Sequence, residues 1–199
     1  MDNSDEEEEK AAKKRSNEQN MIEIYTSLIE PVKRIIEQEG PKEEIKSTFN
    51  ERSSRPLGLL RLRAVELLQQ IASLKKTSLA KSLLSSGVSE NLVNLIKAYP
   101  WNNFLQLRVQ MFLDELLDNE ELTSDEKFTL LKQSSLTQSL VTMSKDASVE
   151  FASGFAVRHG YMGFVTKIAN LINKLADNGL KDQDTAAEVF DEDWNSFVS

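Results

Sequence analysis

From Met21 onward, apolar residues recur at the three- and four-residue spacing of an amphipathic α-helix, and this period constrains the fold more than any other feature. The segment 21–40 carries one such stripe, which Pro31 interrupts and Gly40 ends. Its apolar members are Ile22, Tyr25, Leu28, Ile29, Val32, Ile35 and Ile36. No alternating run bounded by Asn-Gly or Gly-Gly predicts a β-hairpin. The sequence therefore predicts an all-α fold.

The helical segments also repeat along the chain. The tetrapeptides LRLR at 60–63 and LQLR at 105–108 each open a long apolar helix, and shorter helices follow at 92–99 and 136–143. A third long helix with Ile168, Leu171, Ile172 and Leu175 requires an insertion of about 15 residues before it. A period near 44 is typical of armadillo and HEAT arrays. We therefore expect an armadillo/HEAT-like helical-repeat solenoid built from helix pairs, with a helical bundle lacking superhelical order as the alternative.

The two ends of the chain differ from its body in charge. Residues 1–20 carry seven acids and four bases, residues 178–199 carry six acids and one base, and the body between them is neutral. Because residues 1–20 are almost free of large apolar side chains, they are predicted to be a disordered acidic tail before an α-helical domain at 21–199. The neutral body argues against a nucleic-acid partner, and no apolar run reaches the roughly 18 residues of a membrane span.

Residue types that build catalytic sites are scarce in this sequence. There is one histidine, His159, and there are no cysteines. The chain lacks the glycine-rich nucleotide motifs, the nucleophile elbow of hydrolases and the zinc-protease motif. We therefore expect a protein that is not an enzyme and holds no cofactor or metal. The lack of cysteine is consistent with the cytoplasm, and the short basic run KKR at 13–15 leaves the nucleus open.

A corner between two helices stands out at residues 99–103. Pro100 disfavours the α conformation at the residue before it, so the preceding helix is expected to end near Ala98. Asn102 or Asn103 is expected to cap the next helix, a contribution of about 1 kcal/mol. Trp101 beside Phe104 is expected to pack the corner between two layers. The predicted structural corner consists of Tyr99, Pro100, Trp101, Asn102 and Asn103.

Four stretches in order resemble the SAPS-domain family, the regulatory subunits of the protein phosphatase 6 class of Ser/Thr phosphatase. They are LGLLRLRAVELLQQI, the corner SLLSSGVSENLVNLIKAYPWNNFLQLRV, the segment RHGYMGFVTKIANLI, and DEDWNSFVS with its Trp-x-x-Phe element. The resemblance covers about residues 56–199. The family carries His where this chain has Phe164, and its domain continues for further helices beyond Trp194. We therefore expect a fragment or a shortened member.

The resemblance implies a non-catalytic α-helical scaffold. It implies binding to a Ser/Thr phosphatase catalytic subunit, which the scaffold directs to substrates, with further scaffold subunits as an open second class of partner. The competing hypothesis is a generic armadillo/HEAT-like adaptor in trafficking or nuclear transport that binds no phosphatase.

Two sets of residues are candidates for partner contacts. The first set, Arg61, Arg63 and Arg108, recurs at repeat-equivalent places and is predicted to line one groove. Its alternative role is local pairing, for instance of Arg63 with Glu66 three residues on. The second set, Tyr161 and Met162, lies between two glycines just before a long helix, where a structural turn is the alternative.

Overall fold

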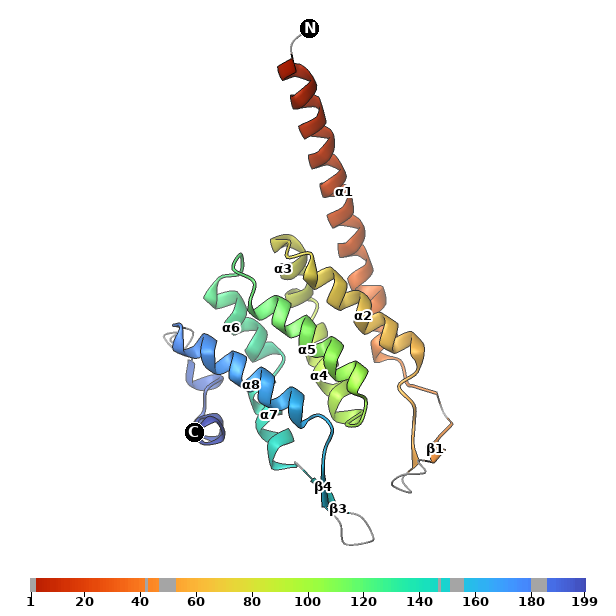
Figure 1. The fold of residues 1–199 in the computed structure, drawn as a ribbon, viewed down its shortest axis with the longest axis vertical. Coiled ribbons are helices and arrows are strands. Elements are labelled where there is room, and N and C mark those ends of the chain that lie inside the picture. Colours follow the sequence, from red (N-terminus) through yellow and green to blue (C-terminus); the bar gives the residue numbers. More distant parts are fainter. Residues whose placement is uncertain (1–2, 42, 47–52, 147, 151–155, 180–185) are drawn as a thin grey trace.

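The computed structural model describes residues 3–41, 43–46, 53–146, 148–150, 156–179 and 186–199, and most of them lie in helices (Figure 1). The helices are α1 (Asn3–Glu37), α2 (Leu59–Ser73), α3 (Thr77–Ser85), α4 (Val88–Ala98), α5 (Asn103–Leu117), α6 (Ser124–Gln133), α7 (Leu136–Lys145), α8 (Met162–Asp177), the 3-10 helix η2 (Ala186–Glu188) and α9 (Glu192–Val198). Two short antiparallel ribbons pair β1 (Ile45–Lys46) with β2 (Ser53–Ser54) and β3 (Ser148–Glu150) with β4 (Ala156–Arg158). The predicted all-α class is confirmed.

The helices form a repeat of three, α2–α4 and then α5–α7, with α8 opening a third unit. Helix α5 begins 44 residues after α2 (103 against 59), and α8 begins 59 residues after α5 (162 against 103). The expected solenoid, its period near 44 and its insertion of about 15 residues are thereby confirmed, and the β3–β4 ribbon occupies that insertion. The repeat holds three helices rather than a pair, because the nine-residue helix α3 escaped the sequence analysis.

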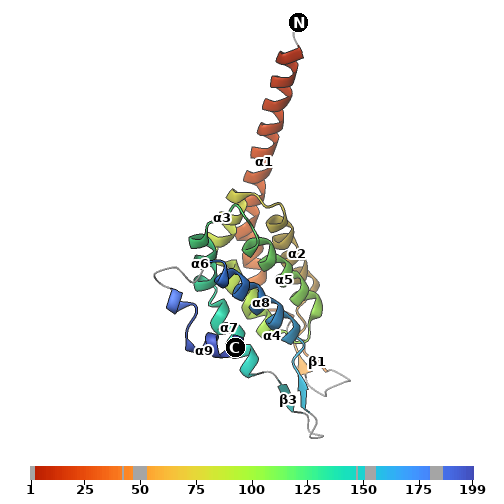
Figure 2. The same cartoon turned by 60° about the vertical axis from the view of Figure 1, so that its left-hand side comes forward.

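The core lies between a front layer of α2, α5 and α8 and the helices α4 and α7 behind it. The three front helices run side by side in the same direction (Figures 1 and 2). Helix α4 packs on α5, and α7 packs on α8. Fully buried side chains from both layers meet there, among them Leu68, Leu92, Ile96, Leu105, Leu113, Leu140, Ile168 and Ile172. Apolar burial of this kind is the main favourable term in the stability of such an array.

The prediction of a disordered tail at residues 1–20 is not what the structure shows. Residues 3–20 form the first half of α1, and they project from the body (Figures 1 and 2). Glu, Lys, Arg and Ala, which dominate this segment, are good helix formers, and Lys14 lies one helical turn from Glu18. The segment also extends a helix that is already packed on the body, so it avoids the cost of nucleating a helix of its own. Glu18 also pairs with Lys76 of the body. Pro31 lies inside the same helix on its exposed side.

The second half of α1 covers the first repeat. Ile29, Val32 and Ile36 are buried there, which matches the stripe expected from the sequence. The ammonium of Lys33 donates to the carbonyl oxygen of Ser86 at 2.7 Å, and this contact fixes α1 against the end of α3. The helix therefore acts as a cap on the open side of α2, α3 and α4, all of which it contacts.

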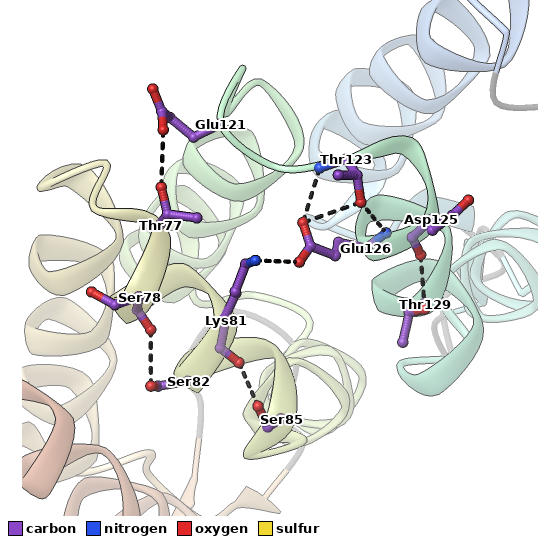
Figure 3. A network of polar contacts seen from close by, with 10 residues as sticks. All are labelled: Thr77, Ser78, Lys81, Ser82, Ser85, Glu121, Thr123, Asp125, Glu126 and Thr129. Atoms are coloured by element: carbon purple, nitrogen blue, oxygen red, sulfur yellow. Dashed lines mark hydrogen bonds and ion pairs between the residues drawn. The ribbon is translucent and has the colours of Figure 1, made fainter.

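Successive repeats meet through polar side chains where α3 approaches α6 (Figure 3). The ammonium of Lys81 lies 2.9 Å from the carboxylate of Glu126, and the Thr77 hydroxyl donates to Glu121 at 3.1 Å. Glu126 also accepts from the backbone N–H of Thr123, whose hydroxyl accepts from the backbone N–H of Glu126, so the two residues form a capping box for α6. We call these residues the α3–α6 joint.

Helix α9 packs against α7 of the second repeat. Trp194 is fully buried, and its indole lies 5.7 Å from the ring of Phe197 in an edge-on arrangement. The Asp191 carboxylate caps the helix by accepting from the backbone N–H of Trp194 at 2.8 Å. The Trp-x-x-Phe element noted in the sequence therefore packs α9 against α7.

Candidate functional site

The N-terminal ends of α2, α5 and α8 lie next to one another along one edge of the front layer (Figure 1), and most of the sequence candidates gather there. We call the first two turns of these helices the N-terminal edge. They carry four cationic side chains and one carboxylate, namely Arg61, Arg63, Arg108 and Lys167 against Glu66. None of the three helices has an acidic residue in its first turn. The edge is therefore positive within a chain whose net charge is −8.

Arg61 is buried, with 8% of its surface exposed, and it joins three segments. Its Nε donates to the carbonyl oxygen of Leu57 at 2.7 Å, and its Nη2 donates to the hydroxyl of Tyr99 at 2.6 Å. A further bond of 3.3 Å reaches the carbonyl oxygen of Gln38, just after α1. The prediction that Arg61 lines one groove with Arg63 and Arg108 is therefore corrected, because its donors are already engaged inside the protein and it lines a pocket that the other two arginines do not reach. Its role is to hold α1, α2 and the end of α4 together.

Arg63 and Arg108 share one carboxylate. Arg63 pairs with Glu66 within α2, as the local alternative had it, and Arg108 of α5 lies 2.6 Å from the other oxygen of Glu66. Arg108 also donates to Gln69 at 3.3 Å. The hydrogen bond from Arg63 and then the charge of Arg108 lower the pKa of Glu66. The trio sets the register of α5 on α2 and leaves the Arg63 side chain 68% exposed.

The corner at 99–103 closes through two amides. Helix α4 ends at Ala98, and the Asn102 side chain caps α5 by accepting from the backbone N–H of Leu105 at 3.0 Å. Gln106 donates to the carbonyl oxygen of Pro100 at 2.8 Å. Asn103 is the first residue of α5 and is exposed. The expectation that Trp101 is packed between two layers is corrected, because the indole is 44% exposed.

The turn before α8 packs against that corner. Tyr161 is 3% exposed, and its hydroxyl donates to the carbonyl oxygen of Asp146 at 2.8 Å. Its ring stacks on the imidazole of His159 at 4.8 Å, and that imidazole lies 5.7 Å from the Trp101 ring. Burial and then the charge of Asp146 raise the pKa of Tyr161. The prediction of Tyr161 as a partner contact is corrected, because the side chain serves the turn.

The two glycines of this turn have different surroundings. A Cβ at Gly160 would lie 2.7 Å from the carbonyl oxygen of Pro100, so the close approach of the two segments requires glycine. A Cβ at Gly163 would meet nothing within 4 Å. Met162 opens α8 and is half-buried, so part of its thioether side chain remains at the surface. Sequence reasoning treated the glycines alike, because spacing carries no information on neighbours.

Large apolar side chains are uncovered on the N-terminal edge and at Trp101 in the corner just before α5, and this was not expected from the sequence. We call them the apolar patch, which consists of Leu59, Leu60, Trp101, Phe104 and Leu107 with exposed fractions of 68%, 65%, 44%, 75% and 49%. From the sequence, Leu60 was expected to be buried, because it shares one stripe at helical spacing with Ala64, Leu67, Leu68 and Ile71. The buried face instead passes through Ala64, Val65 and Leu68. Contiguous exposed apolar side chains of this kind mark interaction sites.

A pocket of about 460 Å³ lies beside the edge, between the end of α1 and α4. Tyr99 and Asn91 are among the residues that line it, and Asn91 donates to the Glu37 carboxylate at 2.8 Å. The charged residues of the lining are two acids and two bases, namely Glu37, Glu39, Arg55 and Arg61, so the formal charge of the pocket is balanced.

Metal clusters and membrane-spanning helices are both absent from the part of the chain that the structure describes. No three His, Cys, Asp or Glu side chains among the described residues gather as a metal site would require. None of the described helices has the length and apolar character needed to span a membrane.

Comparison with known proteins places the chain in a family. The family model for SAPS, SIT4 phosphatase-associated protein, matches residues 77–199, which is more than half of the chain. No solved structure gives a significant match.

Three named proteins are similar to this chain over part of their length. The chain is 28% identical over 159 residues to Serine/threonine-protein phosphatase 6 regulatory subunit 1 of Mus musculus, covering 72% of this chain and 18% of that protein. It is 25% identical over 155 residues to regulatory subunit 3 of Gallus gallus, covering 71% and 18%. It is 34% identical over 124 residues to Extragenic suppressor of kinetochore protein 1 of Schizosaccharomyces pombe, covering 58% and 14%.

The chain thus spans less than a fifth of the length of these relatives. The matched region runs from α3 to α9 of the solenoid and includes the corner, the turn before α8 and the Trp194 element. On this match, the chain belongs to the SAPS family of SIT4 phosphatase-associated proteins.

Proposed function

We propose that this chain is a non-catalytic subunit that binds the catalytic subunit of a protein phosphatase 6-type Ser/Thr phosphatase and directs it to substrates. The observation that carries the proposal is the SAPS match over α3 to α9, together with relatives that are named as regulatory subunits of that phosphatase. A solenoid suits this work, because stacked repeats offer a partner an extended surface rather than a single cleft.

Direct binding tests the proposal. The purified chain is immobilised, and a purified phosphatase 6-type catalytic subunit is titrated over it, with a helical-repeat protein of another family as the control surface. We expect saturable binding to this chain with a Kd of about 1 μM or tighter, equivalent to about −8 kcal/mol, and none to the control. Phosphopeptide hydrolysis is expected from the catalytic subunit and not from the chain alone.

The adaptor hypothesis gives a different result in the same experiment. An adaptor without a phosphatase would leave the catalytic subunit unbound at concentrations well above the expected Kd. That outcome would contradict the proposal.

A further inference from the structure

We propose that the N-terminal edge is the surface on which the phosphatase catalytic subunit docks, through a segment that carries apolar side chains and carboxylates. This inference rests on the proposed function and adds the location and chemistry of the contact. Its starting point is the apolar patch, whose five side chains have between 44% and 75% of their surface exposed.

The patch draws its side chains from two repeats, since Leu59 and Leu60 lie on α2 and Phe104 and Leu107 lie on α5. Glu66 binds both Arg63 and Arg108, so these two arginines stand at the same level of the parallel helices α2 and α5. Leu60 precedes Arg63 by one helical turn, and Phe104 precedes Arg108 by one turn. The apolar side chains of both helices therefore lie together on the N-terminal side of the arginines.

One exposed apolar position and one buried polar position recur in both repeats, whereas Leu60 corresponds to the fully buried Leu105. Leu59 and Phe104 are 45 residues apart, at the offset that relates LRLR to LQLR, and both are more than two-thirds exposed. The buried polar residues Arg61 and Gln106 share this offset, and each bonds a carbonyl in the loop before its own helix. A partner that crosses the repeats therefore meets equivalent side chains in succession.

The charge of the edge favours an acidic partner over a second copy of this chain that meets it patch to patch. Arg63 is 68% exposed beside the patch, and Lys167 of α8 is also exposed. Two copies that met patch to patch would bring these cations together without added carboxylates, and like charges across an interface are costly. A segment with carboxylates beside apolar side chains complements both features of the edge.

Exposed apolar residues provide a matched test. The variant Leu59→Ser/Phe104→Ser changes the patch, and Ile24→Ser changes an apolar side chain on α1 that is 60% exposed and outside the patch. All these positions are exposed, so the melting temperatures are expected to stay near that of the wild type. With the purified catalytic subunit, we expect the double variant to lose affinity by at least about tenfold and Ile24→Ser to keep it.

A second pair tests the charge of the partner segment. Arg63→Glu reverses an exposed charge at the edge, and Arg34→Glu reverses one on α1 that is 72% exposed. We expect Arg63→Glu to weaken binding of the catalytic subunit severalfold and to reduce its salt dependence, because it removes attraction to carboxylates. Arg34→Glu is expected to match the wild type in both measurements.

Three outcomes would overturn the inference, and they separate it from the proposed function. If the wild type and the double variant bind the catalytic subunit equally, the edge is not the docking surface, and the proposed function stands. If the wild type does not bind, the proposed function fails, and the inference fails with it. If sedimentation shows a dimer of the wild type that the double variant lacks, the patch is a self-association surface instead.

Discussion

The α3–α6 joint and the N-terminal edge are two places where successive repeats meet through ion pairs, and they differ in what surrounds those pairs. At the joint, Lys81, Glu126 and Thr77 make their contacts at the surface. At the edge, Arg108 of α5 pairs with Glu66 of α2, the buried guanidinium of Arg61 holds the first repeat together, and apolar side chains remain exposed. Exposed ion pairs contribute little to stability, whereas a buried hydrogen-bonded charge is costly to disrupt. The polar side chains of the joint are therefore paired with one another, whereas the apolar side chains of the edge remain available for contact with a partner.

The largest effect is expected where the edge is held together. Arg61→Met keeps a long side chain but leaves the Leu57 carbonyl and the Tyr99 hydroxyl without their donor. We expect a loss of about 3 kcal/mol in the free energy of unfolding, since each buried unpaired group costs about 1–3 kcal/mol. Urea denaturation measures it. Arg63→Met is the control and should stay within about 0.5 kcal/mol; equal losses in the two variants would contradict the distinction between them.

The next effect concerns the close approach of the corner and the turn before α8. Gly160→Ala would force Cβ to within 2.7 Å of the Pro100 carbonyl oxygen, and we expect a destabilisation of about 1–3 kcal/mol. Gly163→Ala has open space inside a helix, so it is expected to stabilise by about 0.5–1 kcal/mol. Opposite shifts in the urea midpoint are predicted, and shifts of the same sign would show that the two segments do not pack as described.

A smaller effect separates the two amides of the corner. Asn102→Ala removes the cap of α5 and is expected to cost about 1 kcal/mol. Asn103→Ala changes an exposed first-turn residue and should remain within about 0.5 kcal/mol. Urea denaturation of both variants measures the two losses. A larger loss of unfolding free energy for Asn103→Ala than for Asn102→Ala would contradict the assignment of the cap to Asn102.

The smallest effect is expected at the joint, and it depends on pH. The backbone N–H of Thr123 and then the ammonium of Lys81 lower the pKa of Glu126 in the folded state. A lowered pKa means that the contribution is present above the unfolded-state value and is lost as the pH falls through the folded-state value. The small difference in melting temperature between Lys81→Ala and the wild type should therefore shrink as the pH falls from about 7 towards 3. A difference that grows on acidification would contradict the pairing.

The sequence predicted the features that depend on local pattern. The apolar period predicted where the repeats lie. The end of α4 at Ala98, expected from Pro100, and the asparagine cap of α5 are both confirmed. These signals lie within a few residues of the structure they specify, so no knowledge of distant neighbours was needed. The long helix at residues 3–20 was missed because composition was weighed above helix propensity.

The candidate site was less predictable, because burial depends on residues far away in the chain. Arg61 and Arg63 are two residues apart and look alike in sequence, yet Arg61 meets Tyr99, which is 38 residues away, and Arg63 faces solvent. Trp101 was expected to pack the corner between two layers, and it lies half-exposed beside His159. The apolar patch could not be predicted for the same reason, because the exposure of Leu60 depends on how α2 packs against the other helices.

Hydrogen exchange of the chain, with and without the purified phosphatase catalytic subunit, compares the two regions in one experiment. The docking account predicts that bound catalytic subunit slows exchange in peptides covering the first turns of α2 and α5, where helix N–H groups lack intrahelical acceptors, and leaves α3 and α6 unchanged. Slower exchange confined to α3 and α6, with the first turns of α2 and α5 unaffected, would contradict it.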